Sequence, residues 1–149
     1  MESRGIEMDS ASLGVKKGFQ TRFRKEKRGK SMSDLVRVAV DAMGGDYAPV
    51  EPVKGTIEAV NADERVKVQL VGQVDVIEKE LQKYTYPKER VEIVPATEII
   101  ETGEPPVNAI RHKKDSSIVV GMKKVRYGEA DAFISSGSTG AVLVGGQTI

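Results

Sequence analysis

Short runs of strand-forming residues alternate with helix-type apolar patterns along most of this 149-residue sequence, and this alternation constrains the fold more than any other feature. The expected strands, each ending close to a glycine or proline, cover residues 36–41, 67–71, 90–94 and 130–135. The expected helices cover residues 50–61, 74–83, 107–111 and 116–126, and one more begins at Thr139. Parallel strands need crossover connections, so this order predicts a doubly wound α/β fold, with a mostly parallel sheet and helices on both faces.

Charge divides the chain near residue 36. Residues 1–36 contain nine Lys or Arg against five Asp or Glu, whereas residues 37–149 contain fourteen against seventeen. Residues 1–35 also lack a sustained apolar period, so we predict a disordered basic leader there and a folded region over residues 36–149. Three interpretations of the leader stay open: a solvated tail, an arm that binds nucleic acid or an anionic membrane, or translated sequence upstream of a start at Met32. We favour the third, because Met32 lies shortly before the first expected strand.

Composition excludes several kinds of chemistry. The sequence has no Cys and one His, which excludes disulfides, thiolate metal sites and multi-histidine zinc sites. Aromatic residues make up only 5% and Trp is absent, which disfavours a base-stacking surface for nucleic acid. No apolar run approaches the roughly 20 residues that span a bilayer, and the start lacks an apolar signal core. We therefore expect a cytoplasmic protein without a metal or a cofactor.

A glycine turn at residues 135–140 leads from the fourth expected strand into a helix. In open parallel sheets, ligands bind beyond the carboxyl ends of the strands. Gly137 and Gly140 allow close approach, while Ser138, Thr139 and the first N–H groups of the helix direct donors to one spot. This arrangement suits phosphate or another small oxyanion, although the motif is neither a P-loop nor G-x-G-x-x-G. A tight turn with Ser and Thr caps explains the same residues equally well.

Two further clusters are candidates. A basic loop that ends in two hydroxyls precedes the helix of residues 116–126, and it comprises Arg111, His112, Lys113, Lys114, Ser116 and Ser117. Anion binding competes here with a solvated loop and a plain N-cap at Ser116. Asp41 and Asp46 flank Gly44 and Gly45 after the first strand. Two carboxylates do not make a metal site, and turn stabilisation by Asp is at least as good an interpretation.

Together these three stretches resemble the phosphate acyltransferase (PlsX) family. Members open with a strand and Asp-Ala-Met-Gly-Gly-Asp, present here as residues 41–46, and carry Arg-x-Lys-Lys-Asp-Ser-Ser, present as residues 111–117. An Ala-Asp-Ala strand then enters a Ser-x-Gly-Asn-Thr-Gly-Ala loop, which matches residues 130–141 except that Ser138 replaces the usual Asn. The order and spacing of the motifs agree across residues 36–149, about the first third of a full-length member.

The resemblance implies a fold similar to phosphate acetyltransferases and isocitrate or isopropylmalate dehydrogenases, here truncated. It implies acyl transfer from acyl carrier protein to inorganic phosphate, with a homodimer, peripheral membrane association through the missing part, and no nucleic acid. Gly137, Ser138, Thr139 and Gly140 are then the expected phosphate or oxyanion donors. Five residues are expected to support the bound anion: Lys113, Lys114, Arg111, Ser116 and Ser117. Gly44 and Gly45 are expected to shape the floor of the site, and Asp46 is the expected orienting group. We expect the fragment to be inactive alone. The alternative is a nucleic-acid- or anion-binding α/β module that uses the basic leader.

Overall fold

A four-stranded, all-parallel sheet organises residues 35–149, the part of the chain that the computed structural model describes. Its strands are β1 (Val36–Asp41), β2 (Val66–Gly72), β3 (Val91–Pro95) and β4 (Ala132–Ile134), in the spatial order β3-β2-β1-β4. The helices are α1 (Val50–Ala62), α2 (Val74–Leu81), α3 (Pro106–His112), α4 (Ser117–Arg126) and α5 (Thr139–Thr148), with a 3₁₀ turn η1 at Lys88–Arg90. The leader predicted for residues 1–35 lies, except for Leu35, outside the described residues and stays a prediction.

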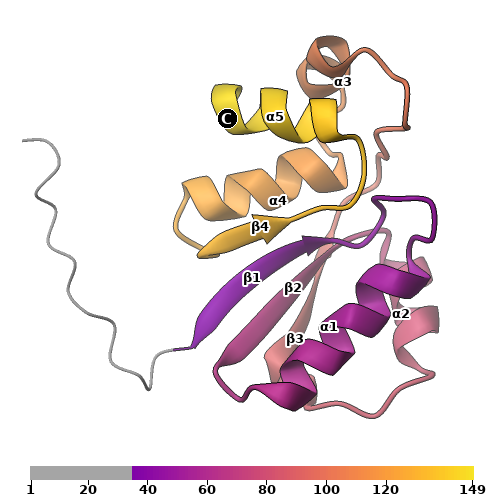
Figure 1. Cartoon of the computed structure of the whole chain (residues 1–149), viewed down its shortest axis with the longest axis vertical. Helices are drawn as coiled ribbons and strands as arrows, with labels where there is room; N and C mark the ends of the chain where they lie inside the picture. The colour runs from indigo at the N-terminus through magenta and orange to yellow at the C-terminus, as the bar shows by residue number, and fades with distance from the viewer. Residues whose placement is uncertain (1–34) are drawn as a thin grey trace, which may run out of the picture. The chain divides into compact units, whose positions relative to one another are not determined.

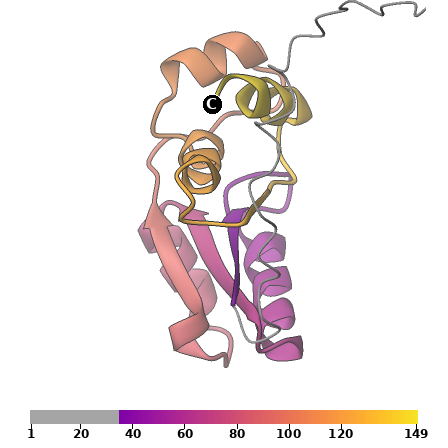
Figure 2. The same ribbon diagram turned by 90° about the vertical axis from the view of Figure 1, so that its left-hand side faces the viewer.

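The helices cover both faces of the sheet. Figures 1 and 2 show α1 and α2 against one face and α4, with α5 outside it, against the other. The chain runs outward from β1 through β2 to β3 and then returns to place β4 on the other side of β1. The strand order therefore reverses between β1 and β4. This arrangement confirms the doubly wound α/β fold expected from the sequence.

Alternating side chains of the strands supply a core to each helical layer. On one face, Val68 and Leu70 of β2 pack with Val53, Ile57 and Val60 of α1. On the other face, Ala39 of β1 and Val71 of β2 are fully buried in the cluster that includes part of α4. A third cluster joins α3, α4 and α5, and it contains Ile110, Ile118, Val119, Met122 and Ala141. Gly121 of α4 lets the ring of Phe133 in β4 approach the helix backbone, where a Cβ atom would collide with it.

The expected elements differ from the structure mainly at two strand ends. The fourth strand was expected over residues 130–135 but covers only Ala132–Ile134. Ala130 instead closes α4, since its N–H donates to the carbonyl of Lys124, and Ser135 turns toward the end of β1. Arg90 belongs to the 3₁₀ turn rather than to β3. Within residues 35–149, no helix is both long enough and apolar enough to cross a bilayer.

Candidate anion site at the carboxyl edge of the sheet

The glycine turns that follow β1 and β4 touch each other through their backbones. A Cβ atom on Gly137 would lie 2.6 Å from both the Cα atom of Gly44 and the backbone nitrogen of Gly45. Gly45 itself has φ of +90°, a conformation that a side chain strains. Glycine is therefore required on both sides of this contact. The structure brings together Gly44, Gly45 and Gly137, which the sequence placed more than ninety residues apart.

Hydrogen bonds hold the two turns in this position. Ser135 donates through Oγ to Asp41 Oδ2 at 2.7 Å, and Met43 N–H donates to Asp41 Oδ1 at 3.0 Å. Ser136 donates through Oγ to the carbonyl of Gly44 at 3.2 Å. Asp41 is only 1% exposed, so these donors compensate a buried carboxylate. Asp41 thus ties together the ends of β1 and β4. The sequence offered Asp41 only as a turn-stabilising or metal-binding carboxylate, and Ser135 was not among the expected anion-binding residues.

The first turn of α5 faces the same edge of the sheet. Ser138 is the N-cap: its Oγ accepts from Ala141 N–H at 3.4 Å, and its φ is +35°. Within residues 35–149, the N–H groups of Thr139 and Gly140 have no hydrogen-bond acceptor, as the first turn of a helix requires. Thr139 is exposed, and it follows the second glycine turn directly in the chain. A helix N-terminus with unpaired donors attracts anions.

Gly140 has a packing role as well. A Cβ atom there would lie 2.7 Å from Cγ of Pro106, the first residue of α3. The first turn of α5 therefore rests on the start of α3. A bulky residue at position 140 would displace α3 as well as obstruct a ligand, so it cannot test phosphate binding cleanly.

Two cations of the basic loop, Lys113 and Lys114, donate hydrogen bonds to other groups of the chain. The ammonium of Lys113 donates to the carbonyl of Ile99 at 2.6 Å and to the carboxylate of Glu104. That hydrogen bond from Lys113 is the main reason why the pKa of Glu104 lies below its usual value. Lys114 donates to the carbonyl of Ile110 at 3.1 Å, and Arg111 is exposed. These contacts fix the loop before α3, and a role in anion binding stays a prediction for all three cations.

Ser116 and Ser117 lie inside the fold. Ser116 is fully buried and caps α4 by accepting from Val119 N–H at 3.4 Å, as the sequence had suggested. Its Oγ also donates to the carbonyl of Lys113 at 2.8 Å. Ser117 is 2% exposed, and its N–H donates to the carbonyl of Glu98. Their hydrogen bonds are those of structural residues, and within residues 35–149 none of them leads to the glycine turns. Their role in anion binding also stays a prediction.

The remaining candidates, Asp46 and His112, are exposed. Asp46 follows Gly45 on the surface of the first glycine turn. His112 is exposed at the end of α3, and its Nδ1 lies 2.9 Å from the carbonyl oxygen of Asn108. Among residues 35–149, no group of three or more acidic, His or Cys side chains is placed to hold a metal ion.

The sequence feature that points to Asp41 also points to Ser135. Both are polar residues directly at the carboxyl end of an expected strand, the position where open parallel sheets bind ligands. Their contact needs β1 and β4 to be neighbours, which the sequence order of the strands does not state. The structure places them side by side at the reversal of the strand order.

The sheet and its site define a class of protein: a doubly wound α/β domain with glycine turns and helix N–H donors at the topological switch point. A family profile described as "Fatty acid synthesis protein" matches residues 36–149. The chain is 47% identical over 111 residues to the phosphate acyltransferase of Halothermothrix orenii, covering 74% of this chain and 33% of that protein. It is 49% identical over 115 residues to the phosphate acyltransferase of Alkaliphilus oremlandii, covering 76% and 34% of the two.

The phosphate acyltransferase of Syntrophomonas wolfei is 50% identical over 108 residues, covering 72% of this chain and 34% of that protein. The chain belongs to this family of fatty acid synthesis proteins. It spans about one third of the length of the curated relatives it matches.

Proposed function

We propose that this region serves a phosphate acyltransferase, which moves a fatty acyl group from an acyl carrier protein thioester to inorganic phosphate. The observation that carries the proposal is the joined pair of glycine turns beside the open first turn of α5. The names of the relatives support acyl transfer and phosphate in general. Acyl carrier protein as the donor, and phospholipid synthesis as the destination of the product, are the finer parts of the proposal.

The chemistry asks for binding and charge stabilisation rather than a protein nucleophile. A phosphate oxygen attacks the thioester carbonyl carbon, a C–O bond forms, the C–S bond breaks, and the thiolate takes the proton that phosphate gives up. The site must hold an anion next to the thioester and stabilise the oxyanion that develops. In this proposal the N–H groups of Thr139 and Gly140, which have no acceptor within residues 35–149, and the hydroxyl of Thr139 hold the anion. Ser138 holds this turn in shape as the cap of α5.

Assembly and location follow from the same proposal. We expect a homodimer that works in the cytoplasm and associates peripherally with a membrane through parts of the longer relatives that this chain does not match. Because the matched region is about one third of those relatives, we expect the chain alone to bind phosphate without turning over acyl groups.

Phosphate binding tests the site directly. Thr139→Asp places a negative charge in the first turn of α5, which suits the helix dipole but repels phosphate. We expect the dissociation constant for inorganic phosphate, measured by ³¹P NMR titration, to rise about tenfold, equivalent to about 1.4 kcal/mol. Gln73→Asp puts the same charge at the N-cap of α2 and is the matched control. Equal phosphate affinity in the unchanged chain and both variants would place phosphate elsewhere.

Activity is the second test. The chain is mixed with acyl carrier protein thioester and phosphate, and acyl phosphate is trapped with hydroxylamine. The phosphate acyltransferase of Halothermothrix orenii is the positive control. Turnover by the chain comparable with that control would contradict the expectation that this region needs the rest of the protein.

A further inference from the structure

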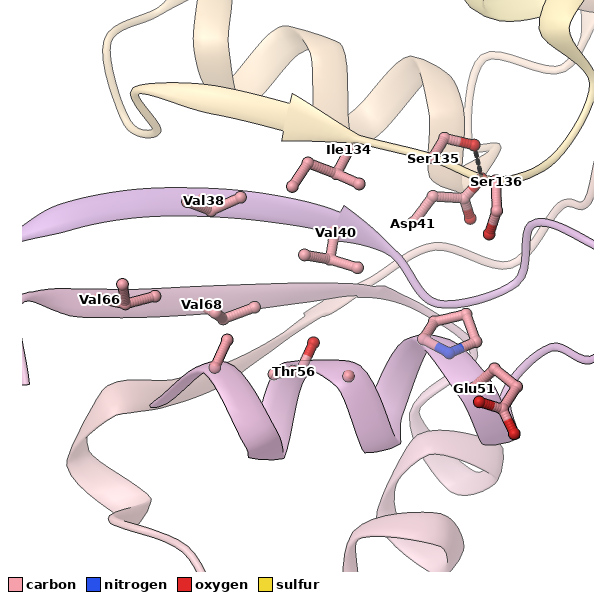
Figure 3. Close-up of a pocket in the computed structure, with 13 residues that line it drawn as sticks. Val38, Val40, Asp41, Glu51, Thr56, Val66, Val68, Ile134, Ser135 and Ser136 are labelled. Atoms are coloured by element: carbon pink, nitrogen blue, oxygen red, sulfur yellow. Dashed lines mark hydrogen bonds between the residues drawn. The ribbon is translucent and has the colours of Figure 1, made fainter. Parts of the chain in front are cut away.

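An apolar groove runs between α1 and the sheet and ends at the candidate anion site (Figure 3). Its volume is about 390 Å³, within the range of about 300–1,000 Å³ typical of pockets for small ligands. Its apolar walls come from three strands and one helix, with side chains that include Val38, Val40, Val68, Ile134, Pro52 and Ala59. Gly55 leaves the helical wall open, because a Cβ atom there would meet nothing within 4 Å.

The groove and the glycine turns share residues. Asp41, Ser135 and Ser136 line one end of the groove, and the same residues make the hydrogen bonds that join the two turns. Figure 3 shows them together at the end of β1 and β4, with Val40 and Ile134 next along the groove. A ligand whose head lies at the glycine turns can therefore extend an apolar tail between α1 and the sheet.

The charge of the lining favours a neutral tail. Among residues 35–149, the charged residues that line the groove are Asp41 and Glu51, which are both acidic, and no Lys or Arg of this part lines it. A second phosphate, a carboxylate or a nucleotide would meet no counter-charge inside. Ile134 is 57% exposed, so the outer wall offers apolar surface to an occupant.

One polar group in the wall of the groove, the hydroxyl of Thr56, is buried. Thr56 is 4% exposed, and its hydroxyl has no hydrogen-bond partner within residues 35–149. Figure 3 shows this hydroxyl on the side of α1 that faces the sheet. Because the hydroxyl oxygen is itself buried, it presents no exposed polar group to an occupant of the groove.

We propose that this groove binds the hydrocarbon chain of the acyl group, with the reacting carbonyl end at Ser135, Ser136 and the glycine turns. The proposal rests on the proposed function, which supplies the acyl group. Its support is the shared end of the two sites, the apolar walls, and the lack of cations among the lining residues that the structure describes. The groove would then select the length of the acyl chain.

Ethyl phosphate and decyl phosphate, the latter below its micelle concentration, probe the head and the tail separately. We expect the whole chain to bind decyl phosphate at least tenfold more tightly than ethyl phosphate, since each buried methylene adds affinity. In ¹³C methyl NMR spectra, decyl phosphate should shift the methyl signals of Val38, Val40 and Ile134. The methyl signals of Val94 and Ile100, which lie in other clusters, should stay in place.

Gly55→Leu fills the groove from its open helical wall, and leucine is a better helix former than glycine. The variant should lose at least tenfold in affinity for decyl phosphate and keep its affinity for ethyl phosphate. Gly146→Leu is the matched control: Gly146 also lies in a helix, and its added Cβ also meets nothing within 4 Å. This control should bind both probes as the unchanged chain does. Equal losses in the two variants would show adsorption of decyl phosphate outside the groove and overturn the proposal.

Other outcomes are equally decisive. Thr56→Val removes the unpaired hydroxyl and should leave decyl phosphate binding equal or stronger. Weaker binding would contradict a hydrocarbon chain beside Thr56. If the two probes bind with equal affinity and the methyl signals of the groove do not shift, decyl phosphate does not enter the groove and the inference is wrong. The proposed function would survive that result, provided that Thr139→Asp still weakens phosphate binding.

Discussion

Ser135 donates a 2.7 Å hydrogen bond to the buried carboxylate of Asp41, although 94 residues separate them in the sequence. The bond joins the carboxyl ends of β1 and β4, the two strands between which the order of the sheet reverses. It also fixes Gly44 against Gly137, so the shape of the candidate anion site depends on it. Figure 3 marks this bond at the end of the apolar groove.

Removing either partner of this bond should destabilise the fold. Asp41→Ala leaves Met43 N–H without its acceptor and leaves Ser135 Oγ only the longer 3.2 Å contact to the carbonyl of Gly137, and Ser135→Ala leaves a buried carboxylate with one donor fewer. We expect each variant to lose about 1–3 kcal/mol of unfolding free energy. Urea unfolding of both single variants and of the double variant measures the coupling. Strictly additive losses would mean that the Asp41–Ser135 contact contributes nothing to stability.

The contact between the glycine turns should not tolerate even one methyl group. Gly137→Ala would bring Cβ to 2.6 Å from the backbone of the first turn, which must shift. We expect a loss of about 1–3 kcal/mol, or roughly 4–8 °C in melting temperature for each kcal/mol. Gly146→Ala, in an open helical position, should be neutral or stabilising by up to about 1 kcal/mol. Thermal unfolding that ranks the two variants in the opposite order would refute this account.

Ser138 occupies a backbone conformation that favours the residue it replaces in the family pattern. Its φ of +35° lies in the left-handed region, where Asn is enriched, and Asn caps helices as well as Ser does. We therefore expect Ser138→Asn to keep or raise the melting temperature, and Ser138→Ala to cost about 1 kcal/mol through the lost cap. If Asn proves as costly as Ala, the cap bond to Ala141 N–H is not the reason for Ser138.

Asp115 gives the fold a dependence on pH. The hydroxyl and the N–H of Thr97 both donate to its carboxylate, and they lower its pKa below the usual 3.8. A lowered pKa stabilises the folded state above the unfolded value, and this stability disappears as pH falls through the folded value. We expect Asp115→Asn to cost about 1 kcal/mol at pH 7, allowing for exposure, and the difference to shrink below about pH 4. Urea unfolding across pH is the measurement, with exposed Glu64→Gln as control; a gap that widens in acid would contradict the assignment.

The basic leader should be dispensable for folding. Residues 1–31 lack a periodic apolar face, so a chain that begins at Met32 should unfold within about 2 °C of the full chain. A midpoint lower by several degrees would refute this prediction. The same pair separates the alternative function: retention on DNA that weakens with salt and is lost with residues 1–31 would favour a nucleic-acid arm.

The sequence by itself determined the fold class, because alternating strand and helix patterns with short connections allow few arrangements besides a parallel sheet. It also located the cap of α4 at Ser116 and the start of α5 at Thr139, since these depend on residues close in the chain. Motif spacing pointed to the family that the comparisons then showed.

Only the tertiary structure decided which strand ends meet. The contact of Gly137 with Gly44 and the bond from Ser135 to Asp41 need β1 and β4 to be neighbours, and strand order is set by packing across the whole sheet. The same holds for Lys113, whose charge the sequence offered to a ligand and the fold directs to Glu104 and the carbonyl of Ile99. Long-range contacts of this kind carry no local pattern, because residues far apart in the chain satisfy one another only once the layers have packed.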